Sequence, residues 1–117
     1  MKKNFLLLLI FLSGFFFSQE YKPDILGNGF EQKTLNFPND YEGKAAATVI
    51  RKKAESPTHK AVLYIHGFND YFFQTEIAEK FNEKGFDFYA LDLRKYGRSY
   101  LPHQTFNNVR NLDEYIA

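Results

Sequence analysis

The stretch Ala61-Val62-Leu63-Tyr64-Ile65-His66-Gly67-Phe68 decides the fold of this chain. Its first five residues are apolar without interruption, which is typical of a strand buried on both faces of a parallel sheet. A second stretch, from Phe86 to Leu91, is also mostly apolar and is interrupted only by Asp87. The two runs are therefore expected to be strands of one sheet.

A helix is expected between these two strands. Phe73, Ile77 and Phe81 recur every four residues and would form one apolar stripe. Asp70 is a suitable N-cap, and Gly85 is a suitable residue to follow the last turn. Strand, helix and strand span about 31 residues, the size of one βαβ unit, so the two strands should run parallel.

Two short strands are expected before this unit. The first covers residues 34–37 and would be ended by Pro38. The second covers residues 45–51 and contains three β-branched residues in a row, Thr48, Val49 and Ile50. The two strands are expected to form an antiparallel pair.

The last part of the chain is expected to form a further helix. It would begin near Phe106 and carry Val109, Leu112 and Ile116 on one side. No glycine, proline or basic last turn marks its end before Ala117. The predicted fold class is therefore α/β, with an antiparallel hairpin followed by a parallel βαβ unit and a chain that ends within a helix.

The N-terminal segment has the pattern of a secretory signal peptide. Lys2 and Lys3 precede an apolar run over residues 5–17, which is shorter than the roughly 20 residues that span a bilayer as a helix. Residues 1–18 are therefore interpreted as a signal peptide with cleavage after Ser18, and the mature protein as secreted or periplasmic. The alternative is an uncleaved membrane anchor. No other segment is expected to cross a membrane, so no stable span remains after removal of the signal.

Charge and cysteine content exclude several classes of protein. The chain has 15 basic and 14 acidic residues, and removal of residues 1–18 takes away two lysines, which changes the net charge from +1 to −1. This balance provides no basic surface for nucleic acid, so no nucleic-acid partner is expected. The chain has no cysteine, which excludes disulfides, thiolate metal sites and a cysteine nucleophile.

Two tracts resemble the α/β-hydrolase superfamily. The stretch from Ala61 to Phe68 is similar to the third strand and oxyanion loop of these enzymes, and Leu91-Asp92-Leu93-Arg94-Lys95-Tyr96-Gly97-Arg98-Ser99 is similar to their fourth strand and the loop after it, commonly D-x-R-G-x-G-x-S. The monoglyceride lipase, lysophospholipase and serine aminopeptidase branch is the most similar. Residues 19–117 would then be the N-terminal portion of such a domain. Lys95 departs from the family pattern, which has glycine at this position.

The resemblance implies roles for three residues of the first loop. The residue after His-Gly in the family donates its backbone N–H to the oxyanion, which gives this role to Phe68. Gly67 would let the backbone turn closely, and His66 would support the loop rather than act as a base. A fixed amide stabilises the negative charge that forms on the substrate oxygen, and the loss of such a donor costs about 3–4 kcal/mol. The alternative is that His66 and Gly67 form only a turn between strand and helix.

The nucleophile, acid and catalytic histidine of the family are not found in this chain. The family nucleophile lies in G-x-S-x-G after the next strand, and no such motif occurs here. Beyond residue 18 the serines are Ser56 and Ser99, and neither has the surroundings of a nucleophile. The parent protein is therefore expected to be an enzyme, whereas this chain alone is predicted to be inactive.

No cofactor or metal is expected. His59, His66 and His103 lie on three separate loops without ligand spacing. The Gly27-Asn28-Gly29 turn lacks the rest of a dinucleotide fingerprint.

The leading functional prediction is a secreted serine hydrolase that acts on a small-molecule carboxylic ester of lipid or acylglycerol type, by a Ser–His–acid triad outside this chain. Three alternatives stay open. The parent could use an aspartate nucleophile, it could be a peptidase of the same branch, or it could be a non-catalytic secreted binding module with a hydrolase fold.

Overall fold

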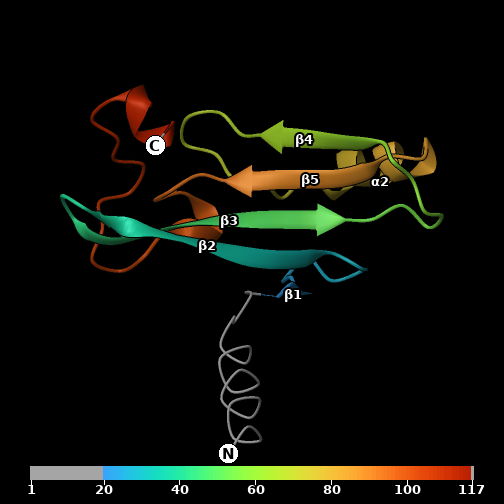
Figure 1. The fold of residues 1–117 in the computed structure, drawn as a ribbon, viewed down its shortest axis with the longest axis horizontal. Coiled ribbons are helices and arrows are strands. Elements are labelled where there is room, and N and C mark those ends of the chain that lie inside the picture. The colour runs from blue at the N-terminus through green and yellow to red at the C-terminus, as the bar shows by residue number, and fades with distance from the viewer. Residues whose placement is uncertain (1–19, 117) are drawn as a thin grey trace, which may run out of the picture.

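The computed structural model describes residues 20–116, which form an α/β domain built on a five-stranded mixed sheet and one α-helix. The elements in chain order are β1 (Lys22–Pro23), β2 (Glu31–Asp40), β3 (Gly43–Lys52), β4 (Ala61–Ile65), α2 (Thr75–Glu83), β5 (Asp87–Asp92) and two short 3₁₀ helices, η1 (Gly97–Ser99) and η2 (Leu112–Tyr115). The strand order across the sheet is β1-β2-β3-β5-β4 (Figure 1). The predicted α/β class is confirmed.

β4, α2 and β5 form the βαβ unit that the sequence predicts. β4 and β5 pair in parallel, with Leu63 opposite Tyr89 and Ile65 opposite Leu91. β5 lies between β4 and β3 and is hydrogen-bonded on both sides, whereas β4 is paired on one side only among the described residues. The carboxyl ends of β4 and β5 therefore lie at the same edge of the sheet, where open α/β sheets bind ligands.

β2 and β3 form the expected antiparallel hairpin, but both strands are longer than predicted. Each is ten residues long. The first was expected to end at Pro38, yet β2 continues to Asp40, and the register shifts between Phe37 and Asp40. Pro38 is tolerated because the ladder is already interrupted there and no strand hydrogen bond depends on its missing N–H.

The start of α2 differs from the prediction. The helix begins at Thr75, and its N-cap Gln74 makes no capping side-chain hydrogen bond. The predicted N-cap role of Asp70 is therefore wrong. Its carboxylate instead accepts a hydrogen bond from the backbone N–H of Tyr71 at 2.8 Å, which shapes the loop before the helix.

The buried side of α2 also differs from the prediction. Ala78 is the fully buried residue of the helix, and Phe81 packs against the core, whereas Phe73 and Ile77 are exposed. The predicted stripe is wrong in part because the helix begins after Phe73 and turns Ala78 toward the sheet. Its end is as expected, since Gly85 follows it with a left-handed φ of +82°.

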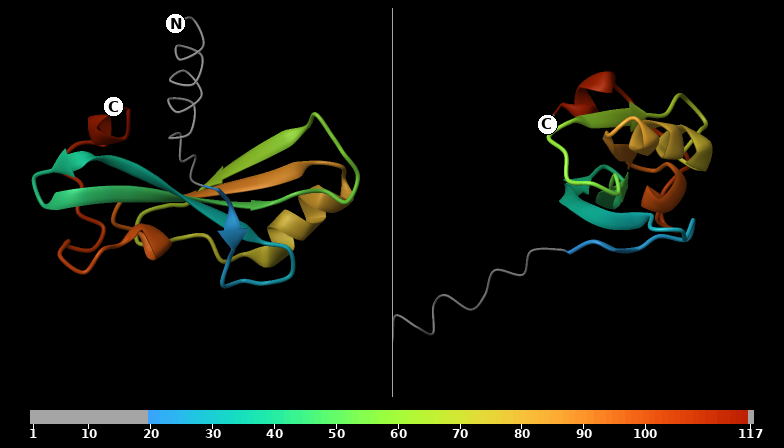
Figure 2. Two further views of the ribbon diagram at one scale, coloured as in Figure 1. Left: turned by 60° about the horizontal axis from the view of Figure 1, so that its bottom comes forward. Right: turned by 90° about the vertical axis from the view of Figure 1, so that its right-hand side faces the viewer.

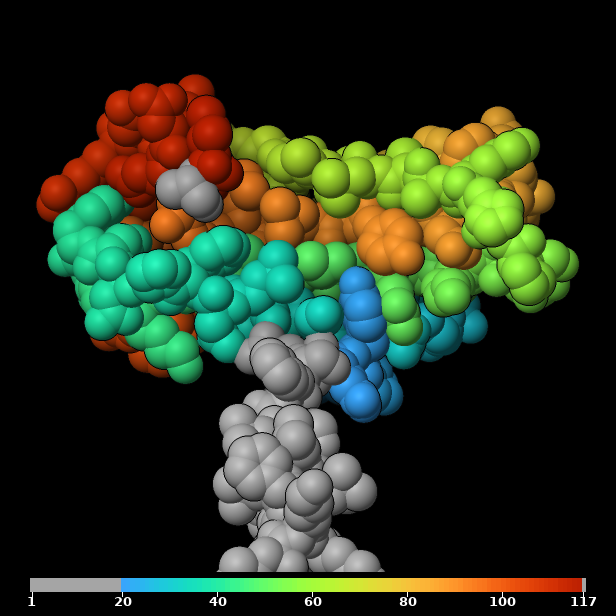
Figure 3. All heavy atoms as spheres, in the orientation of Figure 1, coloured from blue at the N-terminus to red at the C-terminus, as the bar shows by residue number. Residues whose placement is uncertain are grey.

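α2 covers one face of the sheet, and the other face is open (Figure 2). The core lies on the covered face and consists of Phe30, Ile50, Phe72, Ala78, Phe88 and Ala90. Because side chains alternate along a strand, Leu63, Ile65 and Tyr89 point to the other face. Leu63 and Ile65 are 59% and 55% exposed. In Figure 3 the side chains of β3, β5 and β4 are directly visible side by side on this open face.

The predicted C-terminal helix is wrong. Residues 100–111 form turns and irregular loops, and η2 is a single 3₁₀ turn that begins after Asn111, whose side chain accepts a hydrogen bond from Asp113 N. Leu112 and Ile116 are both strongly exposed. The apolar spacing of this segment is helical, but the side chains have no surface to pack on, and such short helices depend on packing.

The sequence predicts a signal peptide at the N-terminus and no other segment that crosses a membrane. The predicted signal peptide over residues 1–18 lies outside the described residues, and so does its cleavage after Ser18. Within residues 20–116 no helix has the length and apolar character needed to cross a bilayer.

Candidate functional site

Two loops meet at the carboxyl edge of β4 and β5. The first loop, residues 66–74, joins β4 to α2, and the second loop, residues 93–99, follows β5 and contains η1. Both were predicted to lie at this edge because parallel strands present their carboxyl ends together. The tip of the β2–β3 hairpin and residues 100–116 lie at the same end of the molecule (Figure 1).

His66 connects the two loops. Its Nε2 accepts a hydrogen bond of 3.0 Å from the backbone N–H of Leu93, and its Nδ1 lies 2.8 Å from the carbonyl oxygen of Gly67. An Nε2 that accepts must be unprotonated, so the neutral ring carries its proton on Nδ1. The ring is buried and packs 4.7 Å from that of Tyr96, between centroids. Both nitrogens are therefore engaged within the protein.

Gly67 and Phe68 follow at the exposed end of the first loop. A Cβ at Gly67 would meet no atom within 4 Å, and the Phe68 side chain is 82% exposed. Among the described residues the Phe68 backbone N–H has no hydrogen-bond acceptor. The amide is therefore available to an acceptor from outside the chain. The oxyanion role of Phe68 stays a prediction.

Asp92 organises the second loop from the end of β5. Its carboxylate is fully buried and accepts hydrogen bonds from the backbone N–H of Phe72 at 2.8 Å and of Arg98 at 3.0 Å. A side-chain Nη1 of Arg98 adds an ion pair at 2.9 Å. Asp92 therefore binds the first loop to the second loop through charge-assisted hydrogen bonds.

Arg98 extends this network to the N-terminal part of the chain. Its guanidinium binds the carboxylate of Asp24 through two hydrogen bonds of 2.7 and 3.0 Å, and it donates to the carbonyl oxygen of Phe72 at 2.8 Å. Burial alone would lower the pKa of Arg98, but the hydrogen bonds to Asp24 and Asp92 outweigh burial and raise it. Asp24, Asp92 and Arg98 are called the aspartate–arginine triad below. The sequence does not predict this triad, since an acid at a strand end with an arginine six residues later is its only local signal.

Lys95 lies in the second loop, at the position where the sequence pattern that this loop resembles has glycine. Its φ is +71°, in the left-handed region where glycine is favoured. The side chain is 2% exposed, and its Nζ lies 3.0 Å from Asp40 Oδ2 and forms a second ion pair with Glu42. Asp40, Glu42 and Lys95 are called the lysine clasp below, because they fasten the hairpin tip to the second loop.

The two serines of the described part of the chain lie in different surroundings. Ser99 is buried, and its Oγ lies 2.6 Å from the carbonyl oxygen of Asp92 and 3.1 Å from Thr48 Oγ1. Its hydroxyl is thus engaged in holding η1 against β3 and β5. Ser56 lies on an exposed loop at the opposite end of the sheet.

The histidines do not gather into a metal site among residues 20–116. His59 and His103 are exposed, and His103 contacts the carbonyl oxygen of Lys44 at 3.0 Å. The described residues contain no group of three or more His, Cys, Asp or Glu side chains placed to hold a metal ion. An open cavity of about 650 Å³ lies near Lys53 and Gly85, at the other end of the sheet from the two loops.

Comparison with known proteins identifies no family for this chain, since no protein-family model, no curated protein and no solved structure matches it. The geometry of the two loops is therefore the basis for any functional conclusion.

Proposed function

We propose that this chain is the N-terminal portion of an exported serine hydrolase that acts on carboxylic esters of lipid or acylglycerol type. The amide of Phe68 would be one donor of its oxyanion hole. The observation that carries the proposal is the Phe68 backbone N–H, which has no acceptor among the described residues. Both ring nitrogens of His66, two residues earlier, already have partners within the protein.

The loop before α2 suits an oxyanion donor for a physical reason. In the transition state of ester hydrolysis, negative charge develops on the former carbonyl oxygen, and a fixed N–H at about 3 Å stabilises it without reorganisation. His66 and Asp92 hold the loop on both sides of Phe68, since His66 bonds Leu93 N and Asp92 bonds Phe72 N. The donor would thus be held in place before the substrate arrives.

The nucleophile, base and acid would come from residues beyond this chain. They would form a Ser–His–acid triad, in which the serine attacks the ester carbonyl and the histidine accepts its proton. The contribution of residues 20–116 would be to position one oxyanion donor and to exclude His66 from proton transfer. No cofactor is needed for this chemistry.

The first test is to sequence the source nucleic acid past codon 117. We expect the reading frame to continue to a G-x-S-x-G motif, and the serine of that motif to be labelled by a fluorophosphonate. An aspartate in place of the serine would replace the serine mechanism by an alkyl-enzyme mechanism. A stop codon directly after Ala117 would reject the hydrolase proposal.

The second test removes the donor itself in that longer protein. Phe68→Pro deletes the backbone N–H, and the preceding Gly67 tolerates a following proline better than other residues do. We expect kcat on an activated ester to fall about 10²- to 10³-fold, with little change in KM. Phe68→Ala is the matched control, because it removes the exposed ring and keeps the amide. Equal kcat values for the two variants would show that the Phe68 amide is not an oxyanion donor.

A further inference from the structure

We propose that Lys95 is a positioning residue for the loop that carries Phe68, and that it acts through Asn107 and Asn69. Its importance for an oxyanion donor rests on the proposed function. The mechanical coupling itself does not, because it concerns contacts within this chain. It is carried by one continuous set of hydrogen bonds between residues of unusual backbone conformation.

Four described residues other than glycine have positive φ, and three of them belong to this set. Asn69, Lys95 and Asn107 have φ values of +58°, +71° and +56°. Such conformations cost free energy and persist where surrounding contacts impose them, often at functional sites. Because hydrogen bonds connect these three residues, we look for one cause of their three positive φ values.

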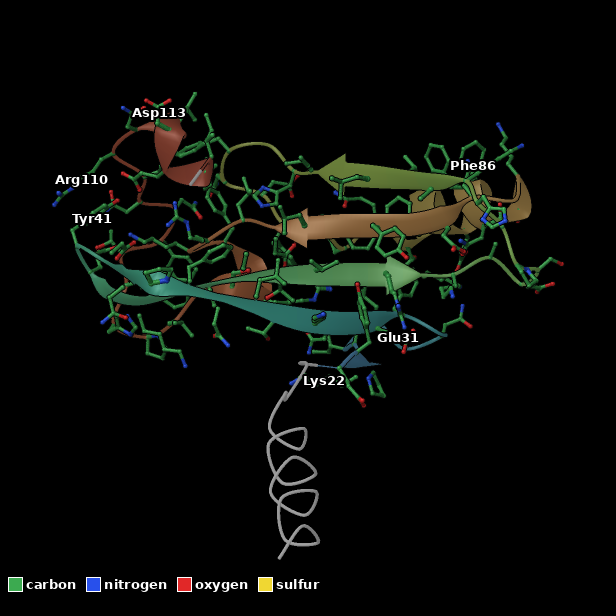
Figure 4. The ribbon with its side chains drawn as sticks, in the orientation of Figure 1. Lys22, Glu31, Tyr41, Phe86, Arg110 and Asp113 are labelled. Carbon is green, nitrogen blue, oxygen red and sulfur yellow. The ribbon has the colours of Figure 1, made fainter. Side chains whose placement is uncertain are left out.

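The connection begins at the lysine clasp. Asp40 and Glu42 of the hairpin tip hold the Lys95 Nζ, and the Tyr41 ring lies 4.2 Å from it. These contacts fix the side chain of Lys95 and, with it, the left-handed backbone at this position. Figure 4 shows Tyr41 at the end of the hairpin, beside Arg110 of the C-terminal segment.

The connection continues through the segment 105–107. The backbone N–H of Asn107 donates to the carbonyl oxygen of Lys95 at 3.2 Å, and the N–H of Thr105 donates to Glu42 Oε2 at 3.0 Å. Both partners of this segment thus belong to the lysine clasp.

The last link reaches the first loop. Asn107 Nδ2 donates to Asn69 Oδ1 at 2.9 Å, and Asn69 directly follows Phe68. A change in the clasp would therefore alter the orientation of the peptide unit next to the Phe68 amide. His66 and Asp92 hold the loop at its two ends, and the Asn107–Asn69 bond holds it at its exposed centre.

The test uses two single variants and their combination in the full chain. In Asn69→Asp, the Asn107 amide still donates to a carboxylate. In Asn107→Asp, the Asn69 amide can rotate and donate in turn. In the double variant two carboxylates face each other without a donor. Asp adopts positive φ nearly as readily as Asn, so the three variants differ mainly in this hydrogen bond.

The readout is the ¹⁵N order parameter of the Phe68 and Asn69 amides, referred to that of Ala90 in β5 to correct for overall tumbling. We expect values near 0.85, typical of rigid backbone, in the unchanged chain and in both single variants, and values below about 0.6 in the double variant. An unchanged order parameter in the double variant, or an equal fall in the single variants, would overturn the proposal.

A second pair of variants tests the origin at Lys95. Lys95→Gly keeps the backbone conformation available but removes the Nζ, and we expect it to lower the Phe68 order parameter as the double variant does. Arg110→Met is the matched control at the same hairpin tip, because Arg110 stacks on Tyr41 at 3.6 Å without joining the connection. It should leave Phe68 rigid, and a fall equal to that of Lys95→Gly would reject a specific role for Lys95. The measurement needs no catalysis, so it can fail or succeed independently of the hydrolase proposal.

Discussion

β4 with the first loop and β5 with the second loop are the same kind of unit, a parallel strand followed by a loop at one edge, yet they differ in almost every contact. β5 is paired on both sides, and its loop is fixed by the aspartate–arginine triad and the lysine clasp. β4 is paired on one side among the described residues, and Leu63, Ile65 and Phe68 are mostly exposed.

The difference shows that β5 and the second loop support the fold, whereas β4 and the first loop expose their side chains to solvent. The second loop contains two cations, the buried Lys95 and the largely buried Arg98, and each contacts two carboxylates. Removing the cation from such a group leaves charges without a partner in the interior, which is strongly destabilising. The first loop is held in place by hydrogen bonds to Leu93 and Arg98 of the second loop and to Asp92 at the end of β5. Substitutions in the second loop should therefore affect the whole domain, whereas those in the first should have local effects.

The largest effect is expected from Arg98→Met. It leaves the fully buried carboxylates of Asp24 and Asp92 without a cation, and we expect a loss of about 3 kcal/mol in the free energy of unfolding, measured with urea. Arg51→Met is the control, because the Arg51–Glu31 pair is partly exposed and its loss should cost about 1 kcal/mol or less. Equal losses would mean that the triad gains nothing from its burial.

A smaller effect is expected from Gly97→Ala. Gly97 has φ of +46°, and a Cβ there would lie 2.5 Å from Tyr71 Cβ and 2.7 Å from Asp92 Oδ2. Strain and overpacking together should cost about 2 kcal/mol in the same urea assay. Gly67→Ala in the first loop is the control, since its Cβ would enter open space, and it should change stability by less than about 0.5 kcal/mol. Comparable losses at both glycines would remove the distinction between the loops.

Acid should weaken the lysine clasp. The hydrogen bond to Lys95 is the main cause that lowers the pKa of Glu42 from 4.5 to about 2, and hydrogen bonds also keep the pKa of Asp40 below its ordinary value although burial opposes this. Because both pKa values are depressed on folding, the stabilisation is complete above about pH 4.5 and is lost as the pH falls toward 2. Urea unfolding between pH 7 and pH 2 measures this change.

The control for the acid effect is the Asp40→Asn, Glu42→Gln double variant. It keeps the shape of the clasp without its titrating groups, so its stability should fall less steeply over the same pH range than that of the unchanged chain. Parallel curves for the two proteins would show that other carboxylates cause the acid sensitivity.

The sequence predicts the parts of this fold that depend on local pattern. The two mostly apolar stretches predict β4 and β5 with their parallel pairing, and Gly85 predicts the end of α2, because short apolar strands and a left-handed glycine are recognisable in the sequence itself. The structure of the C-terminal segment from Phe106 onward could not be predicted in this way. Val109, Leu112 and Ile116 have helical spacing, but this segment forms hydrogen bonds with the hairpin tip instead of a packed helix.

The contacts that hold the candidate site could not be predicted, because they join residues far apart in the chain. The lysine clasp joins Lys95 to acids more than fifty residues earlier, and the triad joins Arg98 to Asp24. The sequence indicates only that Lys95 stands where the pattern that the second loop resembles has glycine. Its positive φ is one that glycine adopts most readily, and the ion pairs with Asp40 and Glu42 stabilise a lysine at this position.

The smallest effect on stability, and the clearest on association, is expected at the edge of β4. A strand with an unpaired edge and exposed apolar side chains is a template for pairing with another chain, and native proteins often protect such edges with lysine. We expect residues 19–117 to self-associate with rising concentration, and the Leu63→Lys, Ile65→Lys variant to remain monomeric in sedimentation experiments, with a change of less than about 1 kcal/mol in unfolding free energy. Ile25→Lys is the control, because Ile25 is 90% exposed but lies outside the strands, and it should leave association unchanged. If Ile25→Lys reduces self-association as much as the β4 variant does, general surface apolarity rather than the open edge of β4 drives association. The unpaired edge would then not distinguish β4 from β5 in self-association.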